Sequence, residues 1–264
     1  MLPTGLRDAL TAAAARDRVL LASDFDGVLA PLRDDPLASR AVPGSLEALR
    51  AAAAVPGTTV SLVSGRDQAV LASLTQVGST PEDPIILIAS HGTESSRPEL
   101  VVPAALDADQ RTLRERLGAG LHEIAQTHAG VRVEVKPTAV VLHTRGVDAA
   151  VAAAASEAAQ ALADTHAGTH RLSGKDIVEL GVVELSKGSA LRQLGQSVGA
   201  QATIYFGDDV TDEKAFAVLD SDAGDVTVKV GPGDTVAAHR LDGVPEVLEA
   251  LEFFAAARES ARSA

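Results

Sequence analysis

The residues best suited to chemistry are two aspartates, Asp24 and Asp26, which directly follow the apolar stretch 19–23. Such a stretch, closed by Gly27, predicts a short buried strand and a turn. In open α/β sheets the carboxyl ends of parallel strands form the usual ligand site. There Asp24 could attack an electrophile while Asp26 transfers a proton. A plain turn, in which both aspartates only bond the backbone, would explain the same residues.

Two shorter motifs offer groups that bind anions. Ser64-Gly65-Arg66 follows a second predicted strand, where a hydroxyl and a backbone N–H could cradle an oxyanion. Lys187 lies in the stretch 184–188, before a predicted helix, and could hold its charge against a phosphate. The alternatives are a simple Ser-Gly turn and an ordinary solvated lysine.

An acidic cluster spans residues 208–213 and contains Asp208, Asp209, Asp212 and Glu213. These four acids follow an apolar run and would repel one another at neutral pH without a cation. Oxygen ligands with no Cys or His nearby favour Mg²⁺. The competing interpretation is that Thr211 or Asp212 caps the next helix.

The elements that must position these motifs form an α/β pattern at both ends of the chain. Apolar, β-branched stretches alternate with helical segments such as 44–54, which is typical of a parallel sheet covered on both faces. We therefore predict a doubly wound, Rossmann-like core. Its predicted strands are 19–23, 58–63, 85–89, 202–206 and 226–230.

The middle of the chain follows a different pattern. It predicts a helix over 109–127, strands over 131–135 and 139–145, a helix over 148–164 and a strand near Ile177. Helices gathered on one side of an antiparallel sheet make an α+β unit. We therefore expect residues 106–180 to form an inserted cap domain, within a core made of 1–105 and 181–264.

Composition narrows the class of partner. The 264 residues carry a net charge of −13, 2% aromatic residues and no cysteine. An acidic chain with few aromatic side chains is a poor match for nucleic acid, and no apolar run approaches the ~20 residues of a membrane helix. We expect a cytoplasmic protein with a small-molecule substrate. The sequence leaves the oligomeric state open, and a monomer is compatible with it.

The four motifs, in this order, resemble the haloacid-dehalogenase superfamily of aspartate-nucleophile phosphotransferases. The resemblance implies that Asp24 is the nucleophile and Asp26 the general acid and then base, with neighbouring acids keeping Asp26 protonated for its first task. It also implies that Ser64 and Lys187 hold the phosphoryl oxygens. Mg²⁺ would bind the Asp24 and Asp208 carboxylates and the Asp26 carbonyl, with Asp209 and Asp212 as neighbouring acids.

Stretches in and around the predicted cap resemble the trehalose-6-phosphate phosphatase family within that superfamily. They are 89–94, 133–136, 143–145, 174–179 and 207–213. The resemblance implies that Glu134, Lys136, Lys175 and Glu179 contact sugar hydroxyls, and that Gly65, Arg66, His91, Gly92 and Arg145 also bind substrate. Two residues depart from the family's usual pattern: Thr144 replaces a frequent Tyr, and Val28 a frequent Thr.

The resemblance implies a Mg²⁺-dependent phosphatase that converts trehalose 6-phosphate to trehalose and phosphate. Three alternatives remain. The chain could act on a related ester such as sucrose phosphate or mannosyl-3-phosphoglycerate, or could be a catalytically silent sugar-phosphate sensor. The charged cap residues could also be ordinary surface ion pairs.

Overall fold

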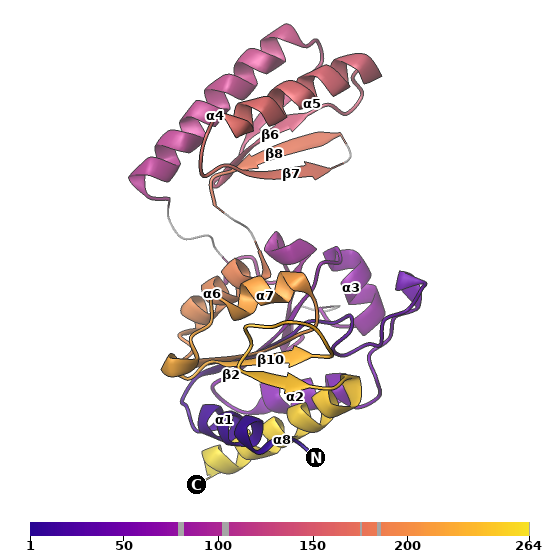
Figure 1. The fold of residues 1–264 in the computed structure, drawn as a ribbon, viewed down its shortest axis with the longest axis vertical. Coiled ribbons are helices and arrows are strands. Elements are labelled where there is room, and N and C mark those ends of the chain that lie inside the picture. Colours follow the sequence, from indigo (N-terminus) through magenta and orange to yellow (C-terminus); the bar gives the residue numbers. More distant parts are fainter. Residues whose placement is uncertain (79–81, 102–105, 175, 184–185, 264) are drawn as a thin grey trace. The chain divides into compact units, whose positions relative to one another are not determined.

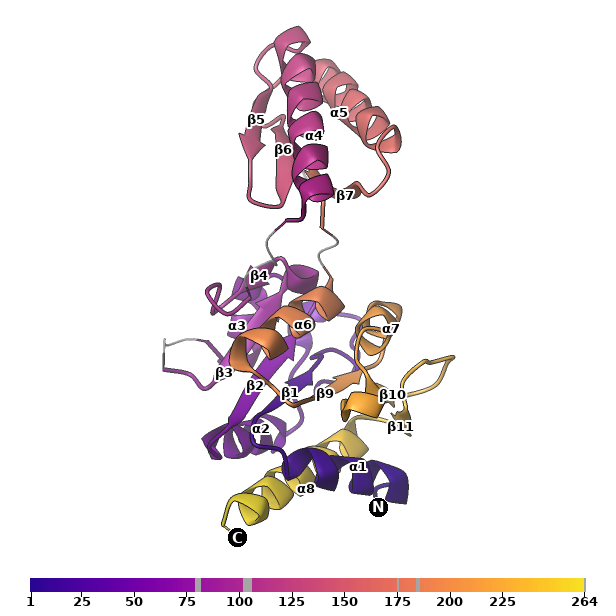
Figure 2. The same cartoon turned by 90° about the vertical axis from the view of Figure 1, so that its left-hand side faces the viewer.

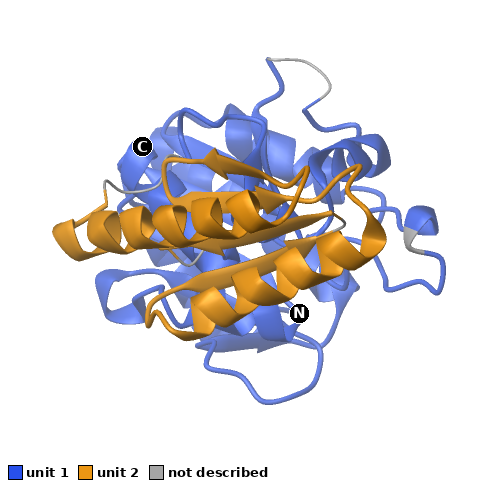
Figure 3. Ribbon diagram, turned by 90° about the horizontal axis from the view of Figure 1, so that it is seen from above, with its two compact units in different colours: residues 1–102, 186–264 blue, residues 103–185 orange. Residues whose placement is uncertain are grey.

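The computed structural model describes residues 1–78, 82–101, 106–174, 176–183 and 186–263. The chain divides into two compact units, shown in Figure 3. Unit 1 comprises Met1–Val102 and Ser186–Ala264, and unit 2 comprises Pro103–Leu185. The predicted insertion, 106–180, falls within unit 2. None of the described helices is long and apolar enough to cross a membrane.

Unit 1 is built on a seven-stranded sheet in the order β11-β10-β9-β1-β2-β3-β4. Its neighbouring strands are parallel, apart from the antiparallel pair of β3 and β4. The strands are β1 (Val19–Ser23), β2 (Thr58–Val63), β3 (Ile85–Ala89), β4 (Glu94–Ser95), β9 (Ala202–Gly207), β10 (Val226–Val230) and β11 (His239–Leu241). The five strands predicted for the core are confirmed; the short β4 and β11 are too brief to give a pattern.

Helices cover both faces of this sheet, so its strands are apolar throughout. Along β1, Val19 and Leu21 pack into one core cluster, whereas Leu20 and Ala22 pack into another on the opposite face. In Figures 1 and 2, α6 and α7 cover one face while α1, α2 and α8 cover the other. The predicted doubly wound α/β core is confirmed.

The helices of unit 1 are α1 (Thr4–Ala14), α2 (Ser45–Ala54), α3 (Gln68–Thr75), α6 (Lys187–Val198), α7 (Val210–Phe216) and α8 (Val244–Ser263). Leu71 and Leu74 of α3 belong to the same hydrophobic cluster as the buried residues of α1, α2 and α8. Three 3₁₀ turns complete the unit: Pro36–Ala38, Ser90–Gly92 and Ser221–Ala223. The predicted helix 44–54 corresponds to α2.

Unit 2 is an α+β fold, as predicted. Helices α4 (Ala108–Thr127) and α5 (Ala149–Asp164) pack on one face of an antiparallel sheet ordered β5-β6-β8-β7. The strands are β5 (Arg132–Val135), β6 (Ala139–His143), β7 (His170–Gly174) and β8 (Ile177–Gly181). The sequence analysis missed β7 because its five residues are all exposed and mostly polar, so no buried alternation marks the strand.

A fully buried arginine, Arg258 of α8, ties several segments together at the amino ends of the strands. Its guanidinium donates to the carbonyls of Ala14 (2.7 Å), Asp17 (2.9 Å) and Gly57 (3.0 Å). It also donates to the carbonyl of Arg16 and the hydroxyl of Thr58. The end of α1 and the starts of β1 and β2 are thereby held by one side chain.

Candidate active site

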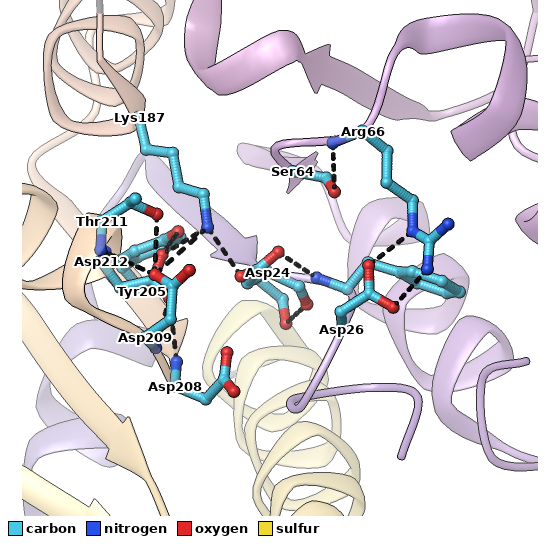
Figure 4. A network of polar contacts seen from close by, with 12 residues as sticks. Asp24, Asp26, Ser64, Arg66, Lys187, Tyr205, Asp208, Asp209, Thr211 and Asp212 are labelled. Carbon is cyan, nitrogen blue, oxygen red and sulfur yellow. Dashed lines mark hydrogen bonds and ion pairs between the residues drawn. The ribbon is translucent and has the colours of Figure 1, made fainter. Parts of the chain in front are cut away.

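The four sequence motifs converge at the carboxyl ends of β1, β2 and β9. Because these strands are neighbours and parallel, the residues after each of them meet at one edge of the sheet. Figure 4 shows the side chains that gather there. A cavity of about 410 Å³ lies at this edge, and its lining residues are Asp24, Asp26, Leu32, Ser64, Gly65, Arg66, His91, Lys187, Asp208 and Asp209.

Lys187 lies at the centre of the site, between two carboxylates. Its ammonium contacts Asp24 Oδ2 at 2.7 Å and Asp212 Oδ1 at 2.9 Å (Figure 4). The Lys187 side chain is only 2% exposed. Ser186 caps α6 and so fixes the first turn that carries Lys187. The lysine is therefore an internal charge, and the solvated alternative does not apply.

Burial and charge act together on this pair. Burial raises the pKa of the Asp24 carboxyl, and repulsion from Asp212 adds to the rise while Lys187 opposes it. Burial alone would lower the pKa of Lys187, but the attraction of Asp24 and Asp212 raises it above its ordinary value. The lysine therefore stays cationic beside the carboxylate that is predicted to attack phosphorus.

Asp212 connects the lysine to the backbone of the acidic stretch. It is fully buried and accepts hydrogen bonds from the Tyr205 hydroxyl at 2.6 Å and from the N–H of Asp208 at 2.9 Å. The N–H of Asp209 donates to the same carboxylate at 3.1 Å. Burial, with the nearby charge of Asp212, raises the pKa of Tyr205 well above its usual value. The phenol therefore stays a hydrogen-bond donor.

Asp208 reaches the Asp24–Asp26 turn through a space that only glycine leaves open. A β-carbon at Gly27 would overlap the Asp208 carboxylate, and Gly27 has a φ of +72° that also favours glycine. Burial and the charges of Asp212 and Asp209 raise the pKa of Asp208 to about 6. The ammonium of the buried Lys229 of β10 donates to the backbone carbonyl of Asp208.

Three carboxylates are arranged so that they could share a metal ion. One oxygen each from Asp24, Asp208 and Asp212 lies within 4.8 Å of the others. An all-oxygen set of this kind suits a hard divalent cation. The cluster is compatible with a metal ion, and it includes Asp212, which the resemblance placed only among the neighbouring acids.

Asp209 plays a mainly local role. Its Oδ1 accepts from the N–H groups of Thr211 (2.8 Å) and Asp212 (3.1 Å), which makes Asp209 the N-cap of α7. The interpretation that Thr211 or Asp212 caps this helix is therefore wrong by two or three positions. Burial alone would raise the pKa of Asp209, but the charge of Lys187 and the Thr211 hydroxyl lower it.

Asp26 is paired with an arginine. Arg66 Nε donates to Asp26 Oδ2 at 2.6 Å and Arg66 Nη2 donates to Oδ1 at 2.8 Å (Figure 4). The buried Ser39 adds its hydroxyl to Oδ1 at 3.0 Å. We expected neighbouring acids beside Asp26, whereas its contact partner is a guanidinium whose pKa is raised by this hydrogen bond.

The loop after β2 lies against the turn after β3. The Ser64 hydroxyl accepts from the N–H of Arg66 at 3.2 Å, and the Ser64 carbonyl accepts from the N–H of His91 at 3.0 Å. A β-carbon at Gly65 would overlap the His91 ring, so this glycine lets the imidazole cover the loop. Gly92 likewise lies against the backbone of Ser186, the residue before Lys187.

The predicted sugar-binding residues of unit 2 are only partly brought together. Glu134 and Glu179 face the same side of the sheet, because both are in register with Val141. Lys136 Nζ contacts Glu179 Oε2 at 2.7 Å, and His143 Nε2 contacts Glu134 Oε2 at 2.8 Å. Arg145 is exposed in the turn after β6. Lys175 lies outside the described residues.

Three residues of the site were missed by the sequence analysis. Tyr205 lies inside the predicted apolar strand 202–206, where nothing marks it as a site residue, and Ser39 lies in a loop without a motif. Lys229 carried a usable signal, because a lysine among valines in a doubly covered strand needs a buried partner.

Comparisons with known proteins identify the family of this chain. A family model described as trehalose-phosphatase matches residues 22–243. The trehalose-6-phosphate phosphatase of Escherichia coli K12 is 29% identical over 246 residues, covering 90% of this chain and 87% of the relative. The bifunctional trehalose-6-phosphate synthase/phosphatase of Thermoproteus tenax is 34% identical over 248 residues, covering 90% of this chain.

The chain spans only part of the length of some of these relatives. It covers 32% of the Thermoproteus tenax protein and 59% of the trehalose-phosphate phosphatase of Mycobacterium leprae. The solved structure of Aspergillus fumigatus trehalose-6-phosphate phosphatase has the same fold, with a TM-score of 0.59 at 23% identity, covering 95% of this chain and 97% of that one. The family model spans most of the chain and confirms the predicted resemblance: the chain belongs to the trehalose-phosphatase family.

Proposed function

We propose that this protein hydrolyses trehalose 6-phosphate to trehalose and phosphate, with Mg²⁺ as its cofactor. The observation that carries the proposal is the buried contact of Lys187 with Asp24, 2.7 Å long, beside Asp208 and Asp212. A nucleophilic carboxylate can approach a phosphate only when cations offset both charges. We place the reaction in the cytoplasm as part of the same proposal, and fractionation of the source cells tests that location.

The chemistry divides between two aspartates. Asp24 attacks phosphorus, the bond from phosphorus to the sugar oxygen breaks, and Asp26 gives the leaving oxygen a proton. Asp26 then takes a proton from the water that attacks the aspartyl-phosphate, which restores Asp24 and releases phosphate. Lys187 and the N–H groups near Ser64 offset the charge of the phosphoryl oxygens during both displacements.

Asp24 and Asp208 are the side chains that we propose for the metal, with the carbonyl of Asp26 and the adjacent Asp212. The open space at Gly27 supports this assignment, because the Asp208 carboxylate fills it and thereby comes close to the Asp24–Asp26 turn. Bound Mg²⁺ would neutralise charge on the phosphoryl group. Asp209 is left as a neighbouring acid that caps α7.

Recognition of the sugar is proposed for unit 2, the predicted cap. Polyols are bound through charge-assisted hydrogen bonds, and Glu134, Lys136 and Glu179 supply such groups on one side of a sheet. Lys175 and Arg145 belong to the same proposal. Within unit 1 we assign Ser64, Gly65, Arg66, His91 and Gly92 to the phosphate end of the substrate.

Phosphate release from a panel of sugar phosphates tests the proposal. The panel contains trehalose 6-phosphate, sucrose phosphate and mannosyl-3-phosphoglycerate, each with Mg²⁺ and with chelator. We expect the highest kcat/KM with trehalose 6-phosphate, and no turnover in chelator. A preference for another ester would overturn the substrate, and binding without release would identify a sensor.

Alanine variants of the unit 2 residues test sugar recognition separately. Glu134→Ala and Lys136→Ala should each lower kcat/KM for trehalose 6-phosphate by roughly 10- to 150-fold, the value of one charge-assisted hydrogen bond. Activity on p-nitrophenyl phosphate, which lacks the sugar, should stay near the wild-type level. Arg171→Ala serves as the control, because Arg171 of β7 forms a surface ion pair of 2.9 Å with Asp164 of α5, away from Glu134 and Glu179, and it should leave both activities unchanged. Equal losses on both substrates would mean that the pairs only stabilise unit 2.

A further inference from the structure

The two carboxylate oxygens of Asp26 are held unequally. Oδ2 accepts from Arg66 Nε at 2.6 Å, whereas Oδ1 accepts from Arg66 Nη2 at 2.8 Å and also from Ser39 Oγ at 3.0 Å. Arg66 Nη2 donates in addition to Ser39 Oγ at 3.3 Å. If Arg66 moves away, Oδ1 keeps the Ser39 bond and Oδ2 loses its partner in this cluster.

A bound substrate would draw Arg66 away from Asp26. A carboxylate chelated on both oxygens by a guanidinium cannot present a proton to a leaving group. Arg66 lines the same cavity as Asp24, Ser64 and Lys187. Guanidinium groups bind phosphate through the same planar fork that binds carboxylate, so a phosphoryl group in this cavity competes with Asp26 for Arg66.

The backbone around Ser39 is held by contacts that do not involve Arg66. It is only 1% exposed, and Arg40 Nη1 donates to the carbonyls of Ser39 (2.7 Å) and Leu37 (2.8 Å). The segment is anchored further along where the N–H of Val42 donates to the carbonyl of Leu29 at 2.9 Å. A serine hydroxyl both donates and accepts, so it can bond Oδ1 before and after proton transfer.

We propose that Ser39 is a positioning residue that holds Oδ1 of Asp26, so that Oδ2 is the oxygen that transfers the proton once Arg66 has exchanged Asp26 for the phosphoryl group. This inference rests on the proposed function. Once Arg66 has left, Oδ2 takes up a proton from water, and in the first displacement the sugar oxygen leaves phosphorus and takes that proton. In the second, Oδ2 takes a proton from the attacking water while the bond from Asp24 to phosphorus breaks, and this proton returns to solvent when Arg66 pairs with Asp26 again.

The test compares kcat/KM for trehalose 6-phosphate with kcat/KM for p-nitrophenyl phosphate. For each substrate, kcat/KM includes only the steps up to the departure of the leaving group. The leaving group of the aryl ester, p-nitrophenolate, departs without a proton. Ser39→Ala should lose about tenfold or more on the sugar ester, the value of a hydrogen bond to a charged group, and stay within roughly twofold on the aryl ester. Arg66→Gln should lose on both, because its guanidinium binds the phosphoryl group of either substrate.

Ser61→Ala is the matched control. Ser61 is a buried serine whose hydroxyl donates to the Ile86 carbonyl at 3.0 Å, so this variant loses a comparable bond that does not involve Asp26. It should leave both kcat/KM values unchanged.

Equal losses of Ser39→Ala on the two substrates would overturn the inference, because a merely structural serine affects both. Wild-type values on both substrates would overturn it as well. If the wild-type protein instead turns over a different sugar phosphate, the proposed substrate is wrong. The same comparison then applies to that ester, whose alkoxide also needs a proton.

Discussion

Unit 1 buries cations at both ends of its parallel strands, and Lys187 and Arg258 make an instructive pair. Lys187, at the carboxyl ends, contacts the carboxylates Asp24 and Asp212. Arg258, at the amino ends, contacts backbone carbonyls and the hydroxyl of Thr58. Both side chains are almost completely shielded from solvent.

The difference lies in what the partners can do. Carbonyl oxygens are neutral and fixed by the backbone, so the Arg258 cluster can only hold segments together. Carboxylates can attack an electrophile, take up a proton or bind a metal ion, so the Lys187 cluster can change its partners during a reaction. Burial lowers the pKa of Arg258, with help from Arg262, whereas charge raises that of Lys187. Carboxylate partners, rather than burial, therefore mark the reactive end.

The largest effect expected at the reactive end comes from Asp24→Asn. The amide keeps the shape of the side chain but cannot attack phosphorus, so turnover should fall by about 10⁴-fold or more. The protein should remain folded, because the substitution removes a charge that burial disfavours, and Lys187 keeps Asp212 as its partner. Phosphate release and a thermal melt measure the two effects. Substantial turnover by the variant would exclude Asp24 as the nucleophile.

At the opposite end, Arg258→Met should act on stability alone. Loss of the guanidinium leaves the carbonyls of Ala14, Asp17 and Gly57 without this donor, which should lower the free energy of unfolding by about 3 kcal/mol. Activity per folded molecule should be unchanged, as measured by denaturant unfolding and by assays well below the melting temperature.

Arg262→Met, on the same helix, is the control for Arg258→Met. Its side chain is 29% exposed and pairs with Asp17 near the surface. It should cost less than about 1 kcal/mol. Selective loss of turnover in Arg258→Met, with the stability retained, would contradict the division between a reactive and a structural end.

Tyr205→Phe should produce a smaller effect, a loss of metal affinity. It removes the 2.6 Å hydrogen bond to Asp212 but keeps the ring, which packs against Phe216. Groups that orient the ligands of a metal typically contribute 10- to 100-fold to its affinity, and we expect a loss near about tenfold. Calorimetric titration with Mg²⁺ measures it. Unchanged affinity would show that Asp212 is held well enough by Lys187 and the backbone.

The smallest expected effect is a pH dependence confined to the reactive end. The pKa of Asp208 is raised to about 6, so below that pH a proton occupies the carboxylate that the metal needs. Apparent Mg²⁺ affinity should therefore fall as the pH drops through about 6, approaching about tenfold per pH unit, and level off above it. Calorimetric titrations with Mg²⁺ at several pH values below and above about 6 measure how the affinity changes with pH. Constant affinity across this range would mean that Asp208 is not a ligand.

Much of the fold was readable because each core strand is a continuous apolar run. A doubly covered parallel sheet requires this pattern, so residues such as Val60 and Ile86 identify their strands without help from distant segments. The exposed β7 and the two- to three-residue strands β4 and β11 lack it. Their existence depends on a neighbouring strand, which a local sequence pattern does not reveal.

The candidate site divides in the same way. Asp24, Lys187 and Asp208 stand in motifs, because their spacing from a strand end or helix start is local. Ser39 and Tyr205 meet their partners only through the tertiary fold: Ser39 bonds Asp26 and Arg66, which lie on two other loops. The central place of Asp212 likewise depends on contact with Lys187, 25 positions away.

The sheet order has a consequence for synthesis on the ribosome. Strand β1 lies between β2 and β9, yet β9 begins at Ala202, after the whole of unit 2 has been translated. When unit 2 is complete in the nascent chain, β1 still lacks one of its two neighbours, and Asp24 has neither Lys187 nor Asp208 beside it. The central strand, with its unpaired edge, must therefore wait for the last third of the polypeptide.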